Sequence, residues 1–475
     1  MSFKANAETA TLFAENLRRA GRIADAEQLE QIIKIEKNAK IKMHFGEALQ
    51  LAMMLHRYEK KEQAEVIYRA LLRVDPDHAR VNHFLGVLLH LDKRRKDALR
   101  YMQRSMKLLG DQAWAWNNFG NLLNDDPKKG AQAQDAYETA LRLAPDYPEA
   151  HNNLGIVFER AGRLEDALQN YKRATELKPD YFEAFYNLGY LYVSLERHDE
   201  AILALSQSIV LQGDDSTRQS RVLMAHAYRA IGQPEKSLAI FREWAQAEPD
   251  NPVARHMLAA QSGEKPDRAA DSFVVSTFDS FADSFDSKLS MLGYRAPQIV
   301  AEALAEAHPD GLSFGVLADA GCGTGLCGVL VRERCKRMIG FDLSAGMLEK
   351  AEARGYDELH KAELTAFLRE RLGAFNSIIS ADTLCYFGEL DQFASAAFGA
   401  LKSRGVLVFT VEALEGEGDD GFRLEPHGRY SHRRGFIEKR LSEAGLTVES
   451  IRQDTLRKED AKPVKGWIVT ARKPG

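Results

Sequence analysis

The sequence has few cysteines, no long apolar run and no excess of positive charge. Its four cysteines, at positions 322, 327, 335 and 385 of 475, form no CxxC pair. This argues against a zinc site, or any other metal site, and against a disulfide framework, so we expect a reducing, cytoplasmic location. No run is long enough to cross a bilayer, and the first residues lack the basic-then-apolar order of a secretory signal. With a net charge of −5, we expect neither a membrane nor nucleic acid as a partner.

The N-terminal half repeats itself with a period of 34 or 35 residues. The glycine that recurs in HFLG, AWNNFG, AHNNLG and FYNLG lies at positions 86, 120, 155 and 189. A small residue recurs in register, followed four residues later by a large apolar one: Ala64 and Tyr68, Ala98 and Met102, Ala133 and Tyr137, Ala167 and Tyr171, Ala201 and Leu205, Ser237 and Phe241. Small residues let two helices approach closely, and the large residues fill the space behind them. These positions are therefore expected to form the core of stacked helix pairs.

This period and pattern resemble the tetratricopeptide repeat family over residues 45–262, as about six repeats. The resemblance implies an all-α solenoid, with residues 1–44 as its helical cap and a concave surface that binds a protein or peptide. Asn118, Asn153 and Asn187 recur two residues before the glycine, where the family lines this surface. Their amides offer a donor and an acceptor to a peptide backbone. The alternative is that asparagine simply suits a polar, solvated groove.

A small, polar segment, AAQSGEKPDRAADS, separates the two halves. We expect residues 263–295 to comprise a linker and a lid helix. The aromatic residues Phe278, Phe281 and Phe285 follow a roughly helical spacing and are expected to pack. Tyr294 is our candidate from this segment for contact with a cofactor or substrate.

Strands and helices alternate from residue 296 onward, which predicts a parallel sheet. The apolar run FGVLADA leads into GCGTG, whose glycines Gly321, Gly323 and Gly325 allow a ligand to approach the backbone. The spacing GxGxG differs from the dinucleotide pattern GxGxxG. Asp342 ends the next strand, at the sheet edge where ligands bind in open α/β folds. An acid there can accept both hydroxyls of a ribose, which favours a nucleoside cofactor.

The two stretches VLADAGCGTG and GFDLSAGMLEKA together resemble the class I S-adenosylmethionine-dependent methyltransferases, over roughly residues 275–475. The resemblance implies a Rossmann-like domain at 296–475 with a seven-stranded sheet, and S-adenosylmethionine as cofactor. The whole arrangement is similar to a bacterial group of methyltransferases that contain tetratricopeptide repeats. The family's cofactor contacts then map to Asp319 and the three glycines for the amino acid part, Asp342 for the ribose, Leu343, Met347, Glu363 and Leu364 near the adenine, and Asp382 near the methyl group. A helix N-cap is the alternative role for Asp382.

The segment EPHGRYSHRRGFI follows the fifth predicted strand, where such enzymes build their substrate site. His432 and His427 are candidate general bases, because an unperturbed imidazole titrates near ~6.5. They are alternatively surface or substrate-orienting histidines. Tyr430 is an equally good hydrogen-bond partner for the substrate. Arg429 and Tyr386 are further candidates for substrate contact.

Three functions remain open from the sequence. The first is a methyltransferase that acts on a protein or peptide recruited by the repeat groove. The second is a small-molecule methyltransferase whose repeats only mediate assembly with other proteins. The third is a scaffold with an inert methyltransferase fold, against which the complete glycine loop, Asp342 and Asp382 argue.

Overall fold

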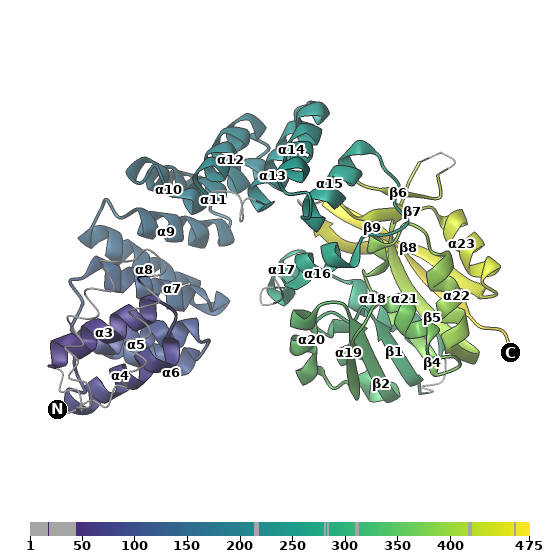
Figure 1. Cartoon of the computed structure of the whole chain (residues 1–475), viewed down its shortest axis with the longest axis horizontal. Coiled ribbons are helices and arrows are strands. Elements are labelled where there is room, and N and C mark those ends of the chain that lie inside the picture. The colour runs from purple at the N-terminus through teal and green to yellow at the C-terminus, as the bar shows by residue number, and fades with distance from the viewer. Residues whose placement is uncertain are drawn as a thin grey trace. The chain divides into compact units, whose positions relative to one another are not determined.

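The computed structural model describes residues 18, 44–212, 218–279, 282, 285–308, 313–416, 420–459 and 462–475. The expected cap at residues 1–44 lies outside this part except for two residues, and Phe281 lies outside it as well. The chain forms two compact units, Met1–Leu223 and Met224–Gly475. Figure 1 draws both, and each is described by itself.

Antiparallel helix pairs build the N-terminal part of the chain, as the repeats predict (Figure 1). The helices are α3 Phe45–Arg57, α4 Lys61–Val74, α5 Ala79–Leu91, α6 Arg95–Met106, α7 Ala113–Asn124, α8 Gly130–Leu143, α9 Pro148–Arg160, α10 Leu164–Leu177, α11 Phe182–Ser194, α12 His198–Gln212, α13 Arg218–Ala230, α14 Pro234–Ala247 and α15 Pro252–Ser262. Most helix pairs begin one repeat period after the previous pair. The predicted solenoid of tetratricopeptide repeats is thereby confirmed.

The repeated small and large residues lie between the two helices of each pair. All six small residues are completely buried, and the six large ones are at most 1% exposed. At Gly155 on α9, a Cβ would lie 2.6 Å from the ring of Tyr171 on α10. Glycine is thus required there by the close approach of an aromatic ring, as the sequence pattern indicates.

Replacing Gly155 with alanine is expected to lower the free energy of unfolding of the N-terminal unit by about 1–3 kcal/mol, because the added methyl group overpacks the contact with Tyr171. The matched control is Gly130→Ala, since no atom lies within 4 Å of a Cβ at Gly130 on α8. There the better helix propensity of alanine should leave stability unchanged or raised. Urea unfolding followed by circular dichroism measures both variants, and equal effects would contradict this account of the repeat glycines.

A single mixed sheet forms the centre of the C-terminal unit. Its parallel part has the order β3-β2-β1-β4-β5, and β9 and β8 continue it antiparallel beyond β5. These are the seven strands that the sequence predicts. The described residues add a short hairpin, β6 and β7, beside the end of β5. The strands are β1 Gly315–Ala320, β2 Cys335–Asp342, β3 Glu358–Lys361, β4 Phe375–Ser380, β5 Leu401–Ala413, β6 Phe422–Leu424, β7 Tyr430–His432, β8 Thr447–Glu459 and β9 Lys462–Arg472.

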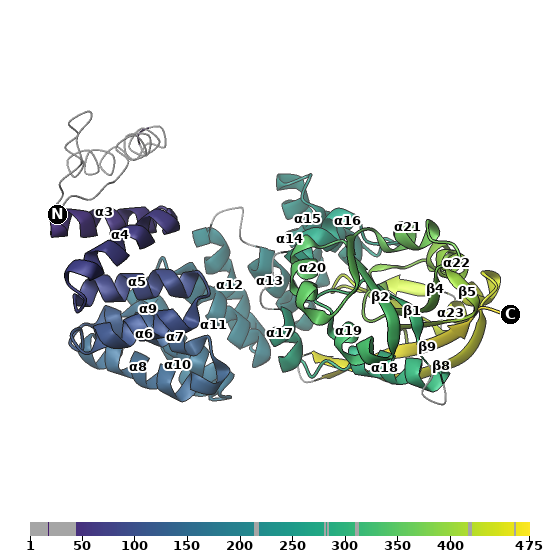
Figure 2. The ribbon, with the colours of Figure 1, turned by 90° about the horizontal axis from the view of Figure 1, so that it is seen from below.

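Helices cover both faces of this sheet (Figure 2). On one face α18 and α19 enclose a core with Leu317, Met338 and Val408. On the other face α21, α22 and α23 enclose a larger core that includes Phe341 and Phe409. The helices of this unit are α16 Asp271–Asp279, α17 Phe285–Met291, α18 Ala296–Ala307, α19 Leu326–Val331, α20 Ala345–Ala351, α21 Leu364–Arg369, α22 Asp391–Ala400 and α23 Arg434–Glu443. The two-layered covering is the doubly wound arrangement expected of alternating strands and helices.

The last repeat helix, α15, packs within the C-terminal unit. His256 stacks on Phe273, with ring centroids 3.8 Å apart, and its Nε2 lies 2.8 Å from the carbonyl oxygen of Gly428. Gln261 donates to the carbonyl oxygen of Pro426 at 2.9 Å. The predicted linker is also bound to the C-terminal unit, because the carbonyl oxygen of Asp267 accepts from the backbone N–H groups of residues 388 and 389. We call residues 264–270, which carry this pairing, the strap.

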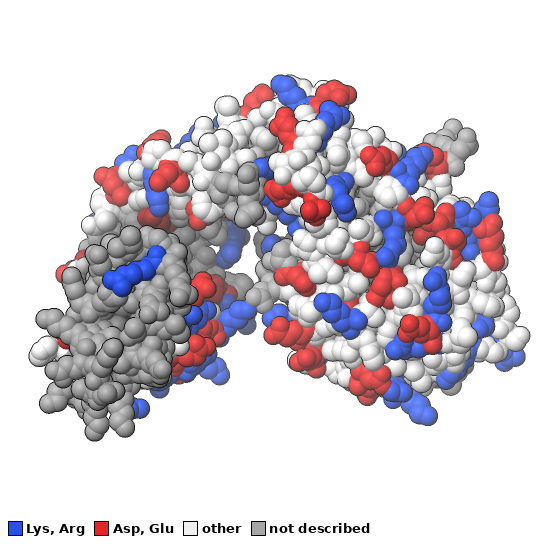
Figure 3. Space-filling model, in the orientation of Figure 1, with Lys and Arg blue, Asp and Glu red and all other residues white. Residues whose placement is uncertain are grey.

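No helix in the described ranges is long and apolar enough to cross a membrane. On the face drawn in Figure 3, basic and acidic side chains are interspersed on each unit. Like charges do not gather there into a broad patch of either sign.

Candidate functional site

The glycine loop follows β1 and is tied to the neighbouring strand. The N–H groups of Gly321 and Cys322 donate to the carbonyl oxygen of Phe341 at 2.9 and 3.1 Å. Gly321 and Gly323 have φ angles of 71° and 55°, a left-handed conformation that glycine adopts without strain. No atom lies within 4 Å of where a Cβ of Gly323 would be. The loop therefore leaves room for a ligand to reach its backbone.

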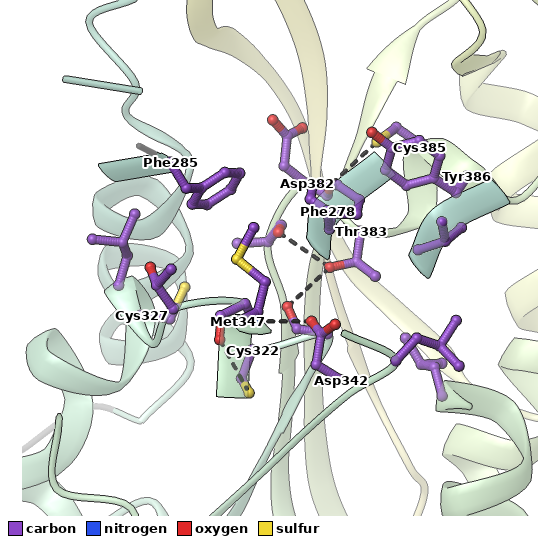
Figure 4. Close-up of a pocket in the computed structure, with 18 of the residues that line it drawn as sticks. Phe278, Phe285, Cys322, Cys327, Asp342, Met347, Asp382, Thr383, Cys385 and Tyr386 are labelled. Atoms are coloured by element: carbon purple, nitrogen blue, oxygen red, sulfur yellow. Dashed lines mark hydrogen bonds between the residues drawn. The ribbon is translucent and has the colours of Figure 1, made fainter. Parts of the chain in front are cut away.

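Asp342 lies at the end of β2, facing this loop. Its Oδ2 accepts from the N–H of Gly323 at 3.0 Å, and its Oδ1 accepts from the N–H of Ser344 at 2.9 Å. Each oxygen has a further lone pair, so both remain able to accept from a ligand. Burial raises the pKa of this carboxyl group. Leu343 and Met347 line the cavity next to it, and Figure 4 shows Met347 and Asp342 on its wall.

Asp319 is the last residue but one of β1 and is 1% exposed. Its Oδ2 accepts from the hydroxyl of Tyr356 at 2.6 Å. Burial raises the pKa of Asp319 to about 7, although the Tyr356 hydroxyl opposes the shift. Near neutral pH this group is therefore divided between its protonated and ionised forms.

Asp319 should make the C-terminal unit less stable as the pH rises. The pKa in the folded state lies above the ordinary value near 3.8, so the folded state holds the proton longer and stability is lost as the pH rises toward 7. Between pH 6 and pH 8 this loss amounts to about 1 kcal/mol. Asp319→Asn keeps an acceptor for the Tyr356 hydroxyl but removes the titrating carboxyl group. The free energy of unfolding of the variant, relative to that of the wild type, should therefore increase by about 1 kcal/mol from pH 6 to pH 8. Urea unfolding at the two pH values measures the difference, and a difference independent of pH would contradict the assignment.

Glu363 also lies on the cavity and caps α21. Its carboxylate oxygens accept from the N–H groups of Thr365 at 3.0 Å and Ala366 at 2.7 Å. Arg268 of the strap donates to Oε1 at 2.8 Å. The predicted contact of Glu363 with the adenine has to coexist with these bonds and stays a prediction. Leu364, the first residue of α21, is buried beside it.

The predicted lid consists of two short helices, α16 and α17, rather than one. Phe278 and Phe285 line the cavity from these helices (Figure 4). Asp286 on α17 accepts from the hydroxyl of Thr324 in the glycine loop at 2.6 Å and forms an ion pair with Arg354. Tyr294, which follows α17, lines the cavity as well. The lid is thus fastened to the glycine loop.

These elements enclose a cavity of about 300 Å³. It brings together most of the site residues that the sequence predicts. Those lining it are Tyr294, Asp319, Gly321, Gly323, Asp342, Leu343, Met347, Glu363, Leu364, Asp382, Tyr386 and Arg429. Gly325, His427, Tyr430 and His432 do not line it. Three cysteines that were not predicted, Cys322, Cys327 and Cys385, do line it, and burial raises the pKa of each thiol well above its ordinary value.

The candidate catalytic residues His427, Tyr430 and His432 do not line the cavity. His432 is completely buried on β7, with its Nε2 3.0 Å from the carbonyl oxygen of Gly388. Burial lowers its pKa to about 4. Tyr430 is also fully buried, and its hydroxyl has no partner among the described residues. His427 is half-exposed, with its Nε2 3.7 Å from Glu412. The geometry gives no support to a catalytic role for these three residues.

A group of five charged residues, which we call the ion cluster, lies beside the sheet edge. Arg457, at 4% exposure, pairs with Asp382 at 2.6 Å, with Glu459 at 2.8 Å, and with Glu412. Arg429 pairs with Glu412 at 2.6 Å and Glu459 at 2.7 Å. Asp382 does not cap a helix with its side chain, because Thr383 takes the N-cap position before residues 384–386. Sequence reasoning missed three members of this cluster, although Glu412 is the only charged residue in the apolar run GVLVFTVEA.

The predicted asparagine ladder forms hydrogen bonds across three successive repeat boundaries. The amide nitrogen of Asn118 lies 3.0 Å from the His83 ring, that of Asn153 donates to Asn117 at 3.0 Å, and that of Asn187 donates to Asn152 at 2.9 Å. Each acceptor occupies the same position of the preceding repeat. Asn118, Asn153 and Asn187 remain partly exposed. The ladder therefore joins successive repeats and still presents its amides at the surface.

Comparison with known proteins identifies both modules. Residues 318–409 match the methyltransferase domain family, 131–162 and 160–196 match the TPR repeat family, and 182–215 match the tetratricopeptide repeat family. Human methyltransferase-like protein 27 is 35% identical over 183 residues, which make up 35% of this chain and 72% of that protein. Tetratricopeptide repeat-containing protein trd-1 of Caenorhabditis elegans is 32% identical over 114 residues, 23% of this chain, and the match spans only 14% of the worm protein.

Solved structures are similar to one module or the other at low identity. PilW, a type IV pilus biogenesis factor, is 18% identical with a TM-score of 0.41, covering 45% of this chain and 98% of PilW. A protein from Listeria monocytogenes, provisionally described as an S-adenosylmethionine-dependent methyltransferase, is 19% identical with a TM-score of 0.31, covering 38% of this chain and 99% of that one. With TM-scores below 0.5, these likenesses add nothing to the sequence matches.

Proposed function

The chain belongs to the methyltransferase domain family and carries tetratricopeptide repeats, and on that premise we propose that it transfers a methyl group from S-adenosylmethionine to a protein or peptide that the repeats recruit. The observation that carries this proposal is the cavity at the end of β1 and β2. An open glycine loop and the carboxylate of Asp342 lie on its wall.

The residues on the cavity wall fit S-adenosylmethionine. Gly323 gives the amino acid part access to the backbone, and Asp319 can face its ammonium group. Asp342 keeps a lone pair on each oxygen for the two ribose hydroxyls. Met347, which is 1% exposed, supplies an apolar surface for the adenine. When bound, the cofactor would supply a methyl group bonded to a positively charged sulfur, and this sulfur is the leaving group when a nucleophile attacks the methyl carbon.

The protein's own task is then to align the nucleophile and to exclude water. The two lid helices serve the second purpose, because Phe278 and Phe285 line the cavity and Asp286 fastens the lid to the glycine loop. The aromatic rings of Tyr294 and Tyr386 on the same cavity can stabilise a cation.

The partly exposed asparagine ladder supports recruitment of a peptide, since its carbonyl oxygens can accept from a peptide backbone. One observation favours the second candidate, a small-molecule methyltransferase whose repeats mediate assembly. Asn153 donates to both Asn117 and Asn121, at 3.0 Å each, so its amide hydrogens are already used between repeats.

Transfer of radiolabelled methyl from S-adenosylmethionine into cell extract tests the proposal. The full-length protein is compared with Asp342→Ala and with a truncated protein that starts at Arg218, the first residue of α13. Truncation at residue 263 is unsuitable, because it removes α15 and its contacts with residues 426 and 428.

Label in a discrete protein band with the full-length protein alone would support recruitment by the repeats. Label only in small molecules, with or without the repeats, would favour the second candidate. Absence of transfer together with absence of S-adenosylhomocysteine binding by the full-length protein would overturn the methyltransferase function itself.

A further inference from the structure

Four of the five members of the ion cluster, Asp382, Glu459, Arg429 and Arg457, line the cavity, and Glu412 pairs with the two arginines beside it. The three carboxylates and two guanidinium groups of the cluster leave one negative charge when all are ionised. Burial opposes ionisation of Glu412 and Glu459, but Arg429 and Arg457 outweigh it, so the pKa values of both fall, that of Glu459 to about 2. Burial around the ring of His427, together with the charge of Arg429, lowers the pKa of this histidine, although its side chain is half-exposed. The cluster therefore has no excess positive charge with which to attract an anionic substrate.

The two arginines of the cluster are already engaged. The Nε, Nη1 and Nη2 atoms of Arg457 each contact a different carboxylate. Arg429 donates to Glu412 through Nε and to Glu459 through Nη2. Both arginines line the cavity, yet their hydrogen-bonding capacity is largely taken up by the protein. They act as counter-charges that hold carboxylates in place rather than as a receptor for a carboxylate or phosphate.

Asp382 carries the unused acceptor of the cluster. Its Oδ2 accepts from Arg457, whereas its Oδ1 is buried and has no hydrogen-bond partner in the part of the chain that the structure describes. Its backbone is held at a φ of 56°, and its N–H donates to the hydroxyl of Thr410 at 2.9 Å. Such a conformation is strained for a residue other than glycine, and strain of this kind concentrates at functional sites. A buried acceptor without a partner is costly unless a ligand supplies a donor.

Aromatic residues line the same cavity as this carboxylate. Tyr294, Phe278 and Tyr386 all line it, and Figure 4 shows Phe278 and Tyr386 near Asp382. The faces of such rings attract cations. This side of the cavity therefore combines an unpaired carboxylate oxygen with aromatic surface, an environment that suits a cationic group with N–H donors.

We propose that the substrate presents an amine, cationic in water, to Oδ1 of Asp382, and that the enzyme methylates this nitrogen. The inference rests on the proposed methyl transfer and names the class of its acceptor. The ammonium first gives one proton to the Asp382 carboxylate. The freed lone pair then forms the new N–C bond while the C–S bond of the sulfonium donor breaks and its electron pair stays on sulfur. The product leaves as a methylated ammonium ion, and Asp382 releases its proton to solvent. Burial raises the pKa of Asp382, so its carboxylate is a better proton acceptor than an exposed one.

Binding of simple probes tests the preference for an amine without requiring turnover. In the presence of S-adenosylhomocysteine, n-butylamine, n-butanol and butyrate are titrated into the full-length protein by calorimetry. We expect n-butylamine to bind at least 10-fold more tightly than n-butanol and butyrate to bind most weakly. Asp382→Asn should abolish the preference while keeping the circular dichroism spectrum of the wild type. Asp454→Asn, which removes an exposed carboxylate paired with Arg295 at 3.2 Å, should retain the preference. Equal binding of the amine and the alcohol, or preferred binding of butyrate, would overturn the inference.

The chemistry of the labelled product provides a second test that needs no variant. Methyl groups transferred by the wild-type protein from labelled S-adenosylmethionine should remain on nitrogen, stable to alkaline hydrolysis and recovered as methylated amine. Label released by alkali as methanol, or recovered on carbon or sulfur, would overturn the inference while leaving the methyltransferase function in place. The two proposals therefore fail by different results.

Discussion

Replacing Asp342 with asparagine is expected to weaken binding of S-adenosylhomocysteine by about 100-fold, because each hydrogen bond to a charged group contributes about 1.5–3 kcal/mol and two ribose hydroxyls lose a charged acceptor. The amide also turns a donor toward the N–H groups of Gly323 or Ser344, both of which now donate to the carboxylate. Calorimetric titration of the purified full-length protein measures this loss.

Glu349→Gln is the matched control for this variant. Glu349 is an exposed carboxylate on α20, the helix that follows Asp342. Its removal should leave the affinity unchanged within about twofold, since charges in high-dielectric surroundings interact weakly. If Asp342→Asn binds as tightly as Glu349→Gln, the cofactor does not use this carboxylate and the proposed site is wrong.

Replacing Arg457 with methionine is expected to lower the free energy of unfolding of the C-terminal unit by about 3–5 kcal/mol at pH 7, the usual cost of removing one partner of a buried ion pair. The variant leaves three carboxylates facing Arg429 alone, and Glu412 among them is almost fully buried. Arg452→Met is the control. Arg452 lies on the same strand, β8, in an exposed pair with Glu306 at 2.6 Å, and its loss should cost less than about 1 kcal/mol.

The effect of Arg457→Met should depend on pH. The pKa values of Glu412 and Glu459 are depressed in the folded wild-type protein, so their ion pairs contribute stability above the ordinary carboxyl pKa and lose it as the pH falls through the folded value. The difference between wild type and variant should therefore be largest near neutral pH and shrink below about pH 4. Calorimetric unfolding at several pH values measures it. A difference that stays the same at every pH would show that Arg457 stabilises the unit by packing instead of by charge.

The parts of the fold that the sequence predicts correctly depend on local spacing. The glycine of each repeat contacts a residue 16 or 17 positions later, so one period of sequence contains both partners. The same holds for the glycine loop and Asp342, which two adjacent strands and the helix between them bring together. Short-range patterns of this kind survive in a linear sequence because neighbouring elements pack against each other.

The ion cluster could not be predicted, because it depends on long-range strand register. Arg457 meets Asp382 across 75 residues and Glu412 across 45, and only the pairing of β9 between β5 and β8 brings these strands close enough. The same limitation explains the placement of Tyr430 and His432. Their sequence position after the fifth strand is consistent with a substrate site, but β7 pairs with the end of β5, and both side chains are fully buried.

The hydrogen bond that recurs at three successive repeat boundaries has a consequence for how this chain can change in evolution. Asn153 bonds to Asn117 in the same way as Asn187 bonds to Asn152. When such a repeat is duplicated or deleted, the repeats that become neighbours can therefore form the same hydrogen bond. The number of repeats upstream of α13 is thus free to vary. The contacts of His256 and Gln261 with Gly428 and Pro426 have no such periodic substitute. Lineages should therefore differ in the number of repeats, while α15 and the turn at residues 425–428 change together.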